Sequence, residues 1–359
     1  MSRERRKGGQ MEQKRKIVVG LSGGLDSACT ALRYAENGWD VTGVFLRMFR
    51  GQSQEDARRA AAEIGIPFSV IGCEDLFENG VIRPFLSEYA KGRTPNPCVL
   101  CNPRVKIGEL CRFAKEHGID RVATGHYAGI GKDENSGRYY IRVSRHLEKD
   151  QSYMLGGLSQ SQLSMLELPL ETAEKEELRS AGLAAGLSSA ALPESQDICF
   201  LPEGDYAAFI ESRLGKSPIG NFVNEKGEVL GRHNGIIRYT VGQRRGLGVS
   251  AAQRLFVKRI DPQTNEVVLS DTDVFSESFA VTDVQLQKPA RICDGERYFC
   301  KVRYAAKPVP VSVFCKDDRI ICRAERPVRA VAPGQFAVFY DGDSAGSAVC
   351  FAGFLSESP

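Results

Sequence analysis

The sequence predicts an α/β protein in which a parallel sheet covered by helices is followed by a small central domain and a C-terminal antiparallel β-barrel. Strand-like and helix-like patterns alternate over the first half of the 359 residues, as is typical of parallel βαβ units. After residue 210 glycine, arginine and short β-like runs dominate. From residue 298 short apolar runs separated by turn residues indicate the strands of a barrel.

These patterns predict four segments. Residues 1–15 are expected to form a disordered basic lead-in, 16–210 a domain built on the parallel sheet, 211–277 a small central domain and 278–359 the barrel. The lead-in has no apolar region of the kind that a secretory signal needs. No apolar run approaches the roughly 20 residues of a membrane span, so we expect no membrane partner.

The first strand, at 17–20, runs into a glycine-rich loop and then into a helix that continues to residue 35. Glycines let main-chain N–H groups approach an anion, and the first turn of a helix adds unpaired donors. The loop therefore predicts a phosphate site. A Walker A loop is excluded because it needs a lysine after its last glycine. The loop residues are Gly20, Leu21, Ser22, Gly23, Gly24, Leu25, Asp26 and Ser27.

Further strands are predicted at 40–46 and 67–71, with a helix at 55–64 between them. Parallel strands bind ligands at their carboxyl ends, which is where the glycine loop and Leu46 lie. Another helix is expected at 80–91.

Two cysteines, Cys98 and Cys101, follow Pro95 and Pro97, and a helix is predicted from 105 to 117. The prolines indicate a stiff loop. Thiols near a helix start can gain thiolate character. The spacing also permits half a zinc site or two inert cysteines.

A strand at 120–124 ends beside Gly125 and His126, where a nucleotide or base could bind. The pattern then predicts a hairpin at 139–145 and helices at 159–167 and 173–185. Cys199 lies between two apolar residues, and by itself this pattern indicates a buried small side chain.

Eleven cysteines without disulfide-scaffold spacing are typical of a reducing cytosol, so we expect a cytoplasmic protein. The net charge is only +3, but it is unevenly distributed. Residues 232–259 contain seven Lys or Arg and no carboxylate. Local density of positive charge favours a polyanionic partner, although a solvated basic surface is the alternative.

Seven motifs occur in order along the chain. They are SGGLDS at 22–27, GRTPNPCVLCN at 92–102, ATGHY at 123–127, KDQSY at 149–153, SQDICF at 195–200, YTVGQRRGLG at 239–248 and APGQ at 332–335. Together they resemble the tRNA-specific 2-thiouridylase family, part of the PP-loop ATP pyrophosphatase superfamily. The resemblance runs from about residue 16 to the C-terminus.

The resemblance implies a PP-loop catalytic domain and an enzyme that replaces the C2 oxygen of the wobble uridine with sulfur, in the tRNAs for Lys, Glu and Gln. ATP with Mg²⁺ would be a substrate, Asp26 would help hold the Mg²⁺, and no tightly bound cofactor or resident metal is expected. Cys101 would be the nucleophile and Cys199 would carry a persulfide received from a sulfur-relay protein, and the two would close a disulfide. Adenylation turns the C2 oxygen into a good leaving group.

The resemblance also assigns binding residues. ATP contacts fall on residues 20–27, Leu46 and Gly125. Target-base contacts fall on Asn96, Pro97 and Cys98. Contacts to tRNA fall on His126, Lys149, Asp150, Gln151, Arg303, Tyr304 and Gln335.

Two departures from the family pattern are visible: a short segment after Leu46, and the ending Phe351-Ala-Gly-Phe354. A paralogue with another tRNA preference, a different PP-loop adenylating enzyme and a non-catalytic RNA-binding protein are the alternatives. An iron–sulfur cluster on Cys98, Cys101 and Cys199 is a minor one.

Overall fold

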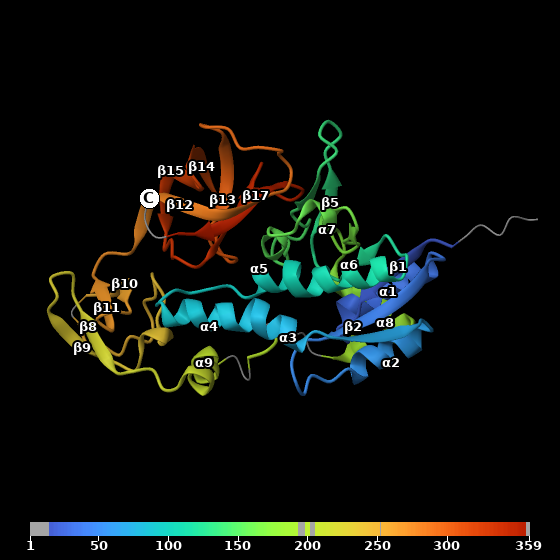
Figure 1. Ribbon diagram of the computed structural model, residues 1–359, viewed down its shortest axis with the longest axis horizontal. Coiled ribbons are helices and arrows are strands. Elements are labelled where there is room, and N and C mark those ends of the chain that lie inside the picture. Colours follow the sequence, from blue (N-terminus) through green and yellow to red (C-terminus); the bar gives the residue numbers. More distant parts are fainter. Residues whose placement is uncertain (1–13, 193–197, 202–204, 252, 357–359) are drawn as a thin grey trace, which may run out of the picture.

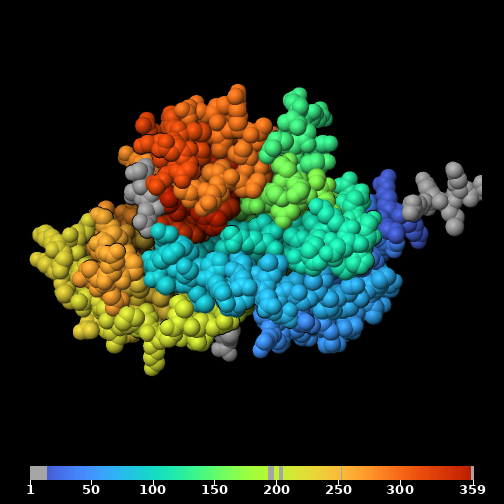
Figure 2. Space-filling view, in the orientation of Figure 1, coloured from blue at the N-terminus to red at the C-terminus, as the bar shows by residue number. Residues whose placement is uncertain are grey.

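The computed structural model describes residues 14–192, 198–201, 205–251 and 253–356. Figure 1 shows three parts: an α/β part at the N-terminal end, a small sheet of β8–β11 at the opposite end, and a barrel above the helices that join them. In the space-filling view the barrel packs directly onto the first part (Figure 2).

The catalytic part is built on a five-stranded parallel sheet in the order β3-β2-β1-β4-β7. Alternate residues along its strands pack on opposite faces. Ile17 and Val41 face the helices that follow β1 and β2, whereas Val18 and Val44 face α6. The elements are β1 (Lys16–Gly20), α1 (Leu25–Glu36), β2 (Asp40–Arg47), α2 (Glu55–Ile64), β3 (Phe68–Gly72), β4 (Val122–Ala123) and β7 (Leu166–Glu167).

Two long helical segments differ from the prediction in where they begin. The segment expected at 80–91 starts earlier, as α3 (Glu74–Phe77), a π-helical turn η1 (Glu78–Ile82) and α4 (Arg83–Ala90). The segment expected at 105–117 also starts earlier, as α5 (Cys98–Cys101), a π-helical turn η2 (Asn102–Lys106) and α6 (Ile107–Glu116). The prediction that both cysteines lie in a loop is therefore wrong, because α5 spans Cys98–Cys101.

The physical reason lies in the prolines around the cysteines. Pro97 occupies the N-cap of α5, where a missing N–H costs nothing. Pro103 lies inside η2 and removes one donor from the helical ladder, and π-turns arise at such interruptions. The chain thus starts its helix directly at Cys98 and widens it after Cys101.

Between the sheet strands lie short elements. The hairpin predicted at 139–145 is wrong in its range, because β6 (Tyr139–Arg142) pairs with the preceding strand β5 (Gly129–Lys132). The helix predicted at 159–167 is only α7 (Gln160–Leu163), because the chain then turns into the edge strand β7. The remaining elements are η3 (Ser152–Leu155), α8 (Lys175–Ala184), η4 (Ser188–Ala191) and α9 (Tyr206–Leu214).

The central sheet has the order β10-β11-β8-β9. The β-like run predicted at 235–241 is instead the 3-10 turn η6 (Ile236–Arg238). Ile236 is buried in the core of this part, whereas Ile237 is buried in the core of the first part. Its strands are β8 (Gly220–Val223), β9 (Val229–His233), β10 (Phe256–Asp261) and β11 (Glu266–Ser270).

The C-terminal part is a closed barrel of antiparallel strands, as predicted, in the order β12-β15-β14-β13-β16-β17. Its strands are β12 (Phe275–Leu286), β13 (Arg297–Lys301), β14 (Val309–Lys316), β15 (Arg319–Arg329), β16 (Phe336–Tyr340) and β17 (Val349–Leu355). The division at 210 and 277 stays a prediction. Over the described ranges, no helix is long and apolar enough to cross a membrane.

Candidate functional site

A cavity of about 220 Å³ lies at the carboxyl ends of β1, β2 and β4. Many of the residues that line this cavity were predicted from the sequence as site residues. Predicted residues that line it are Gly20, Leu21, Ser22, Asp26, Ser27, Leu46, Gly125, His126 and Gln151. Unpredicted ones include Met48, Gln52, Lys106 and Thr124. The cavity therefore joins the glycine loop to the strand ends, as expected for a nucleotide.

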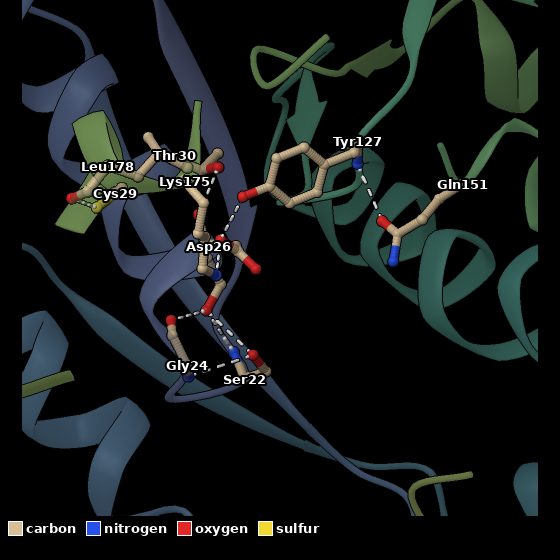
Figure 3. A network of polar contacts seen from close by, with 10 residues as sticks. Ser22, Gly24, Asp26, Cys29, Thr30, Tyr127, Gln151, Lys175 and Leu178 are labelled. Atoms are coloured by element: carbon tan, nitrogen blue, oxygen red, sulfur yellow. Dashed lines mark hydrogen bonds and ion pairs between the residues drawn. The ribbon is translucent and has the colours of Figure 1, made fainter. Parts of the chain in front are cut away.

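The glycine loop is held by its own serines. Ser27 Oγ accepts a hydrogen bond of 3.1 Å from the Ser22 amide and donates one of 2.9 Å to the Gly24 carbonyl (Figure 3). Gly24 is the N-cap of α1 and Leu25 is buried behind it. Gly23, at φ +91°, has no room for a side chain, because a Cβ there would lie 2.8 Å from Asp56.

Gly125 permits a close approach of two loops. A Cβ at this position would lie 2.8 Å from the Asp26 carbonyl carbon and 2.9 Å from the Ser27 amide nitrogen. Main chain cannot yield as a flexible side chain can. Gly125 is therefore required for the strand end at β4 to pack against the glycine loop.

Asp26 is held by two residues that the sequence prediction missed. Lys175 Nζ lies 2.7 Å from Asp26 Oδ1, and Tyr127 Oη donates a hydrogen bond of 2.9 Å to the same oxygen. In Figure 3 both side chains point at Asp26 from different elements. Tyr127 lies inside the quoted motif 123–127, whereas no local pattern marks Lys175.

The carboxylate of Asp26 fits the proposed magnesium ligand, because hard oxygen donors suit Mg²⁺ and the remaining ligands can be phosphates and water. Its side chain is 33% exposed toward the cavity. No cluster of three or more His, Cys, Asp or Glu side chains that could hold a metal occurs among the residues described.

Cys101 lies behind the cavity wall, in contact with the lining residue Met48. Its side chain is 5% exposed, and its thiol donates to Met48 Sδ at 3.9 Å. Burial raises the pKa of the Cys101 thiol to about 12. Met48 belongs to the short segment after Leu46, and Gln52 accepts a hydrogen bond from its amide at 2.8 Å. The shortened segment thus forms part of the wall.

Cys199 is exposed, in contrast to the buried side chain that its neighbours alone predicted. The reason is that Phe200 supplies the packing. Its ring lies 5.5 Å from that of Phe77 and 5.6 Å from that of Phe85. This packing keeps Cys199 near Cys98 and Cys101, and its charge contributes to raising the pKa of both thiols. Residues 195–197 of the predicted motif lie outside the described part of the chain.

Lys106 and His126 also line the cavity. His126 Nδ1 lies 2.8 Å from Thr124 Oγ1. Burial, aided by the nearby Lys106 charge, lowers the pKa of His126 to about 3. Its imidazole is therefore neutral at physiological pH.

The residues predicted to meet the target base lie together at the start of α5. Asn96 Oδ1 accepts a hydrogen bond of 3.0 Å from the Cys98 amide, which caps the helix start. Pro97 is buried and Cys98 is half-buried. Burial raises the pKa of Cys98.

The predicted tRNA contacts differ in exposure. The Lys149 ammonium lies 5.9 Å from the Tyr127 ring centroid, and Gln151 Oε1 accepts from the Tyr127 amide at 2.9 Å. Asp150 is buried; it accepts from the Ser144 amide at 2.9 Å and from the Ser152 hydroxyl at 2.7 Å. Burial raises its pKa.

The C-terminal members of that set lie at the barrel. Arg303 donates to the Val241 carbonyl at 2.8 Å, so it bridges barrel and central part. Tyr304 is exposed. Gln335 donates to the Thr94 carbonyl, and Thr94 Oγ1 donates to Thr240 Oγ1 at 3.1 Å. The loop before α5 thus contacts all three parts of the molecule.

The basic stretch 232–259 is only partly neutralised. Arg238, Lys258 and Arg259 pair with carboxylates from outside the stretch or at its end. In the described structure Arg232, Arg244, Arg245 and Arg254 are exposed and form no such ion pair. These four arginines are available to an anionic partner.

Family models match most of the chain. Residues 15–203 match the tRNA methyl transferase HUP domain, 207–271 the tRNA methyl transferase PRC-barrel domain and 276–349 the aminomethyltransferase beta-barrel domain.

Curated relatives match over almost the whole length. The chain is 40% identical to a tRNA-specific 2-thiouridylase MnmA of Acetivibrio thermocellus, over 92% of this chain and 97% of the relative. It is 41% identical to the protein of the same name from Lachnoclostridium phytofermentans, again over 92% and 97%. With this identity and coverage, the chain is an enzyme of the tRNA-specific 2-thiouridylase family.

Proposed function

We propose that this protein is a cytoplasmic tRNA-uridine 2-sulfurtransferase. It uses ATP to adenylate the C2 oxygen of the wobble uridine and replaces that oxygen with sulfur, releasing AMP and pyrophosphate. The observation that carries the proposal is that one cavity adjoins both the phosphate site expected for ATP and the thiol expected to take part in sulfur transfer. Its wall includes the glycine loop and Met48, and Met48 contacts the thiol of Cys101.

The first step needs a phosphate site and a leaving group. The glycine loop, residues 20–27, and the start of α1 would offer main-chain N–H groups to pyrophosphate. Leu46 and Gly125, which line the cavity, would lie around the nucleotide. Asp26 would hold Mg²⁺ against the phosphates. Attack of the uridine oxygen on the α-phosphorus releases pyrophosphate and leaves AMP bonded to that oxygen.

The second step transfers sulfur. The terminal sulfur of a Cys199 persulfide attacks C2, and the C–O bond breaks with its electron pair leaving on AMP. The Cys101 thiolate then attacks the Cys199 sulfur, and the electron pair of the broken S–S bond passes to the sulfur on C2. The products are a thiocarbonyl and a Cys101–Cys199 disulfide, which a cellular thiol reduces.

The RNA would bind across the catalytic part, the central part and the barrel. The wobble base, turned out of its loop, would meet Asn96, Pro97 and Cys98. Direct tRNA contacts would come from His126, Lys149, Gln151, Arg303 and Tyr304. The buried Asp150 and Gln335 would hold the surface in shape.

The partners follow from this chemistry. They are the tRNAs for Lys, Glu and Gln, and a sulfur-relay protein that delivers a persulfide to the exposed Cys199. Exposure suits this role, because the donor protein must reach the sulfur atom. Segments 16–210, 211–277 and 278–359 would act as the catalytic, RNA-gripping and barrel domains.

Incubation of the purified protein with unmodified tRNA, Mg-ATP and a persulfide donor tests the proposal. We expect AMP and 2-thiouridine in equal amounts, measured by nucleoside mass spectrometry, and loss of thiouridine in Cys101→Ala and Cys199→Ala. AMP without thiouridine would favour another adenylating enzyme. Full thiolation by Cys199→Ala would contradict the sulfur route.

A further inference from the structure

Lys106 occupies a position between the nucleotide cavity and the cysteines. It is the last residue of the π-turn η2, which begins directly after Cys101. Its side chain lines the cavity together with His126 and the glycine loop. π-turns occur frequently at functional sites. Here the π-turn places the Lys106 side chain in the cavity wall, five residues after Cys101.

Lys106 lines the cavity together with Met48, whose sulfur atom lies 3.9 Å from the Cys101 thiol. Burial lowers the pKa of Lys106, but neighbouring Cys101, Cys199 and Cys98 raise it by more, so the net shift is upward. The other titratable group beside it is His126, whose pKa its charge lowers. The ammonium is therefore charged at neutral pH and shared by three thiols.

The carboxylate in the same cavity is already engaged. Asp26 pairs with Lys175 at 2.7 Å, and within the described chain Lys106 forms no ion pair with an acidic side chain. Lys175 therefore pairs with the carboxylate of the glycine loop, whereas Lys106 lies near the sulfur atoms.

A cation beside Cys101 favours its thiolate. Its burial disfavours the thiolate, whereas both the ammonium and the main-chain N–H of Lys106 lower its pKa. A protonated thiol is a poor nucleophile. Without an opposite charge nearby, a thiolate in this setting would be rare at physiological pH.

We propose that Lys106 is a further catalytic residue, whose ammonium stabilises the Cys101 thiolate and the anionic persulfide sulfur on Cys199 during sulfur transfer. The role rests on the proposed function. The Cys101 proton leaves to solvent before the thiolate attacks, and the cation compensates the negative charge while it moves from one sulfur to the next.

Thiol reactivity tests this assignment without tRNA or ATP. Peptide mass spectrometry would follow the alkylation rate of Cys101 by iodoacetamide between pH 7 and 10 in the wild type, Lys106→Met and Lys106→Arg. We expect Lys106→Met to react at least about tenfold more slowly at pH 8, because one pKa unit changes the thiolate fraction tenfold. Lys106→Arg should stay within a few-fold of wild type.

Lys115→Met is the matched control, since Lys115 is exposed on α6 of the same helical segment. It should leave the alkylation profile of Cys101 unchanged. Thermal unfolding would verify that each variant is folded, and Lys106→Gln, which also removes the charge, replaces the methionine variant in the test if that variant unfolds. A folded Lys106→Met with the wild-type rate and pH profile would overturn the assignment.

A parallel thiolation assay separates the two proposals. If the wild type makes 2-thiouridine and Lys106→Met loses it while Lys106→Arg retains it, Lys106 acts in sulfur transfer. If the wild type makes no 2-thiouridine, the proposed function fails, whereas the alkylation profiles still decide whether Lys106 controls the Cys101 thiolate.

Discussion

The ammonium of Lys175, at the start of α8, lies 2.7 Å from Oδ1 of Asp26 on the glycine loop, although 149 residues separate them. The lysine side chain is only 8% exposed. A nearly buried cation beside the phosphate loop compensates the carboxylate before nucleotide binds, and it also adds positive charge where pyrophosphate would develop.

Replacing Lys175 with methionine should therefore weaken ATP use. We expect the KM for ATP to rise about tenfold or more, which corresponds to at least about 1.4 kcal/mol, because Asp26 loses its counter-charge and the phosphates lose a cation. Initial rates of tRNA-dependent AMP formation measure this. Lys226→Met, on an exposed turn of the central sheet, should leave the KM unchanged, and equal effects of both would refute the role.

Gly125→Ala should damage the same loop by steric conflict. Its Cβ would lie within 3 Å of main-chain atoms of Asp26 and Ser27, and overpacking of this kind costs about 1–3 kcal/mol. We expect a lower denaturation midpoint together with loss of ATP binding, followed by urea unfolding and equilibrium dialysis. In Gly231→Ala the nearest atom to the new Cβ is 3.5 Å away, so that variant should behave as wild type.

The sequence predicted the sheet and the nucleotide loop well because both depend on local signals. β1, the glycines and the start of α1 form one continuous pattern, and α2 matches the predicted 55–64 at both ends. The helix start at Cys98 was missed because proline marks a helix start as readily as a loop, and the start at Glu74 was missed because no capping side chain marks it. Burial of Phe77 in the core stabilises the second of these early turns.

The missed site residues share a different cause. Lys175 and Asp26 meet only through the packing of α8 on α1, and no spacing in the sequence encodes that contact. Lys106 reaches the cavity because Pro103 interrupts the helix and a π-turn follows. Cys199 is exposed because its neighbour Phe200 takes the buried place.

His126 should make stability fall in mild acid. Burial and the Lys106 charge lower its pKa to about 3 from an ordinary value near 6.5, so between these values the unfolded chain binds a proton that the folded protein does not. Stability is therefore lost as the pH falls below about 6.5. From pH 7.5 to 5 we expect wild type to lose about 1–2 kcal/mol more than His126→Asn.

Urea unfolding at the two pH values measures this difference. His117→Asn, which alters an exposed histidine at the end of α6, should keep the full pH dependence of the wild type. Identical pH dependence in wild type and His126→Asn would show that this imidazole is not held neutral by the fold.

The exposed arginines of the central part should contribute to tRNA affinity through phosphate contacts. Arg244 and Arg245 form no ion pair with a described carboxylate, whereas Arg259 Nη1 lies 2.6 Å from Asp261 Oδ2. Each phosphate contact adds about 0.7–0.9 to the slope of log affinity against log salt. We expect Arg244→Ala/Arg245→Ala to reduce that slope by up to about 2 in filter-binding titrations, and Arg259→Ala to change it little. An unchanged slope in the double variant would exclude these two contacts.

Gln335 should couple the barrel to the sulfur chemistry. Its amide donates to the carbonyl of Thr94, two residues before Asn96, and Thr94 also bonds Thr240 of the central part. Gln335→Leu leaves that carbonyl unpaired, at a cost of about 1–3 kcal/mol, and loosens the loop that leads into Cys98 and Cys101. Thiouridine formation should fall several-fold, while ATP binding without tRNA stays normal because the glycine loop is untouched. Gln285→Leu, on β12 of the same barrel, loses only a bond to its neighbour Leu286 and should retain activity. Equal thiolation by the two variants would mean that the barrel does not position the cysteine loop.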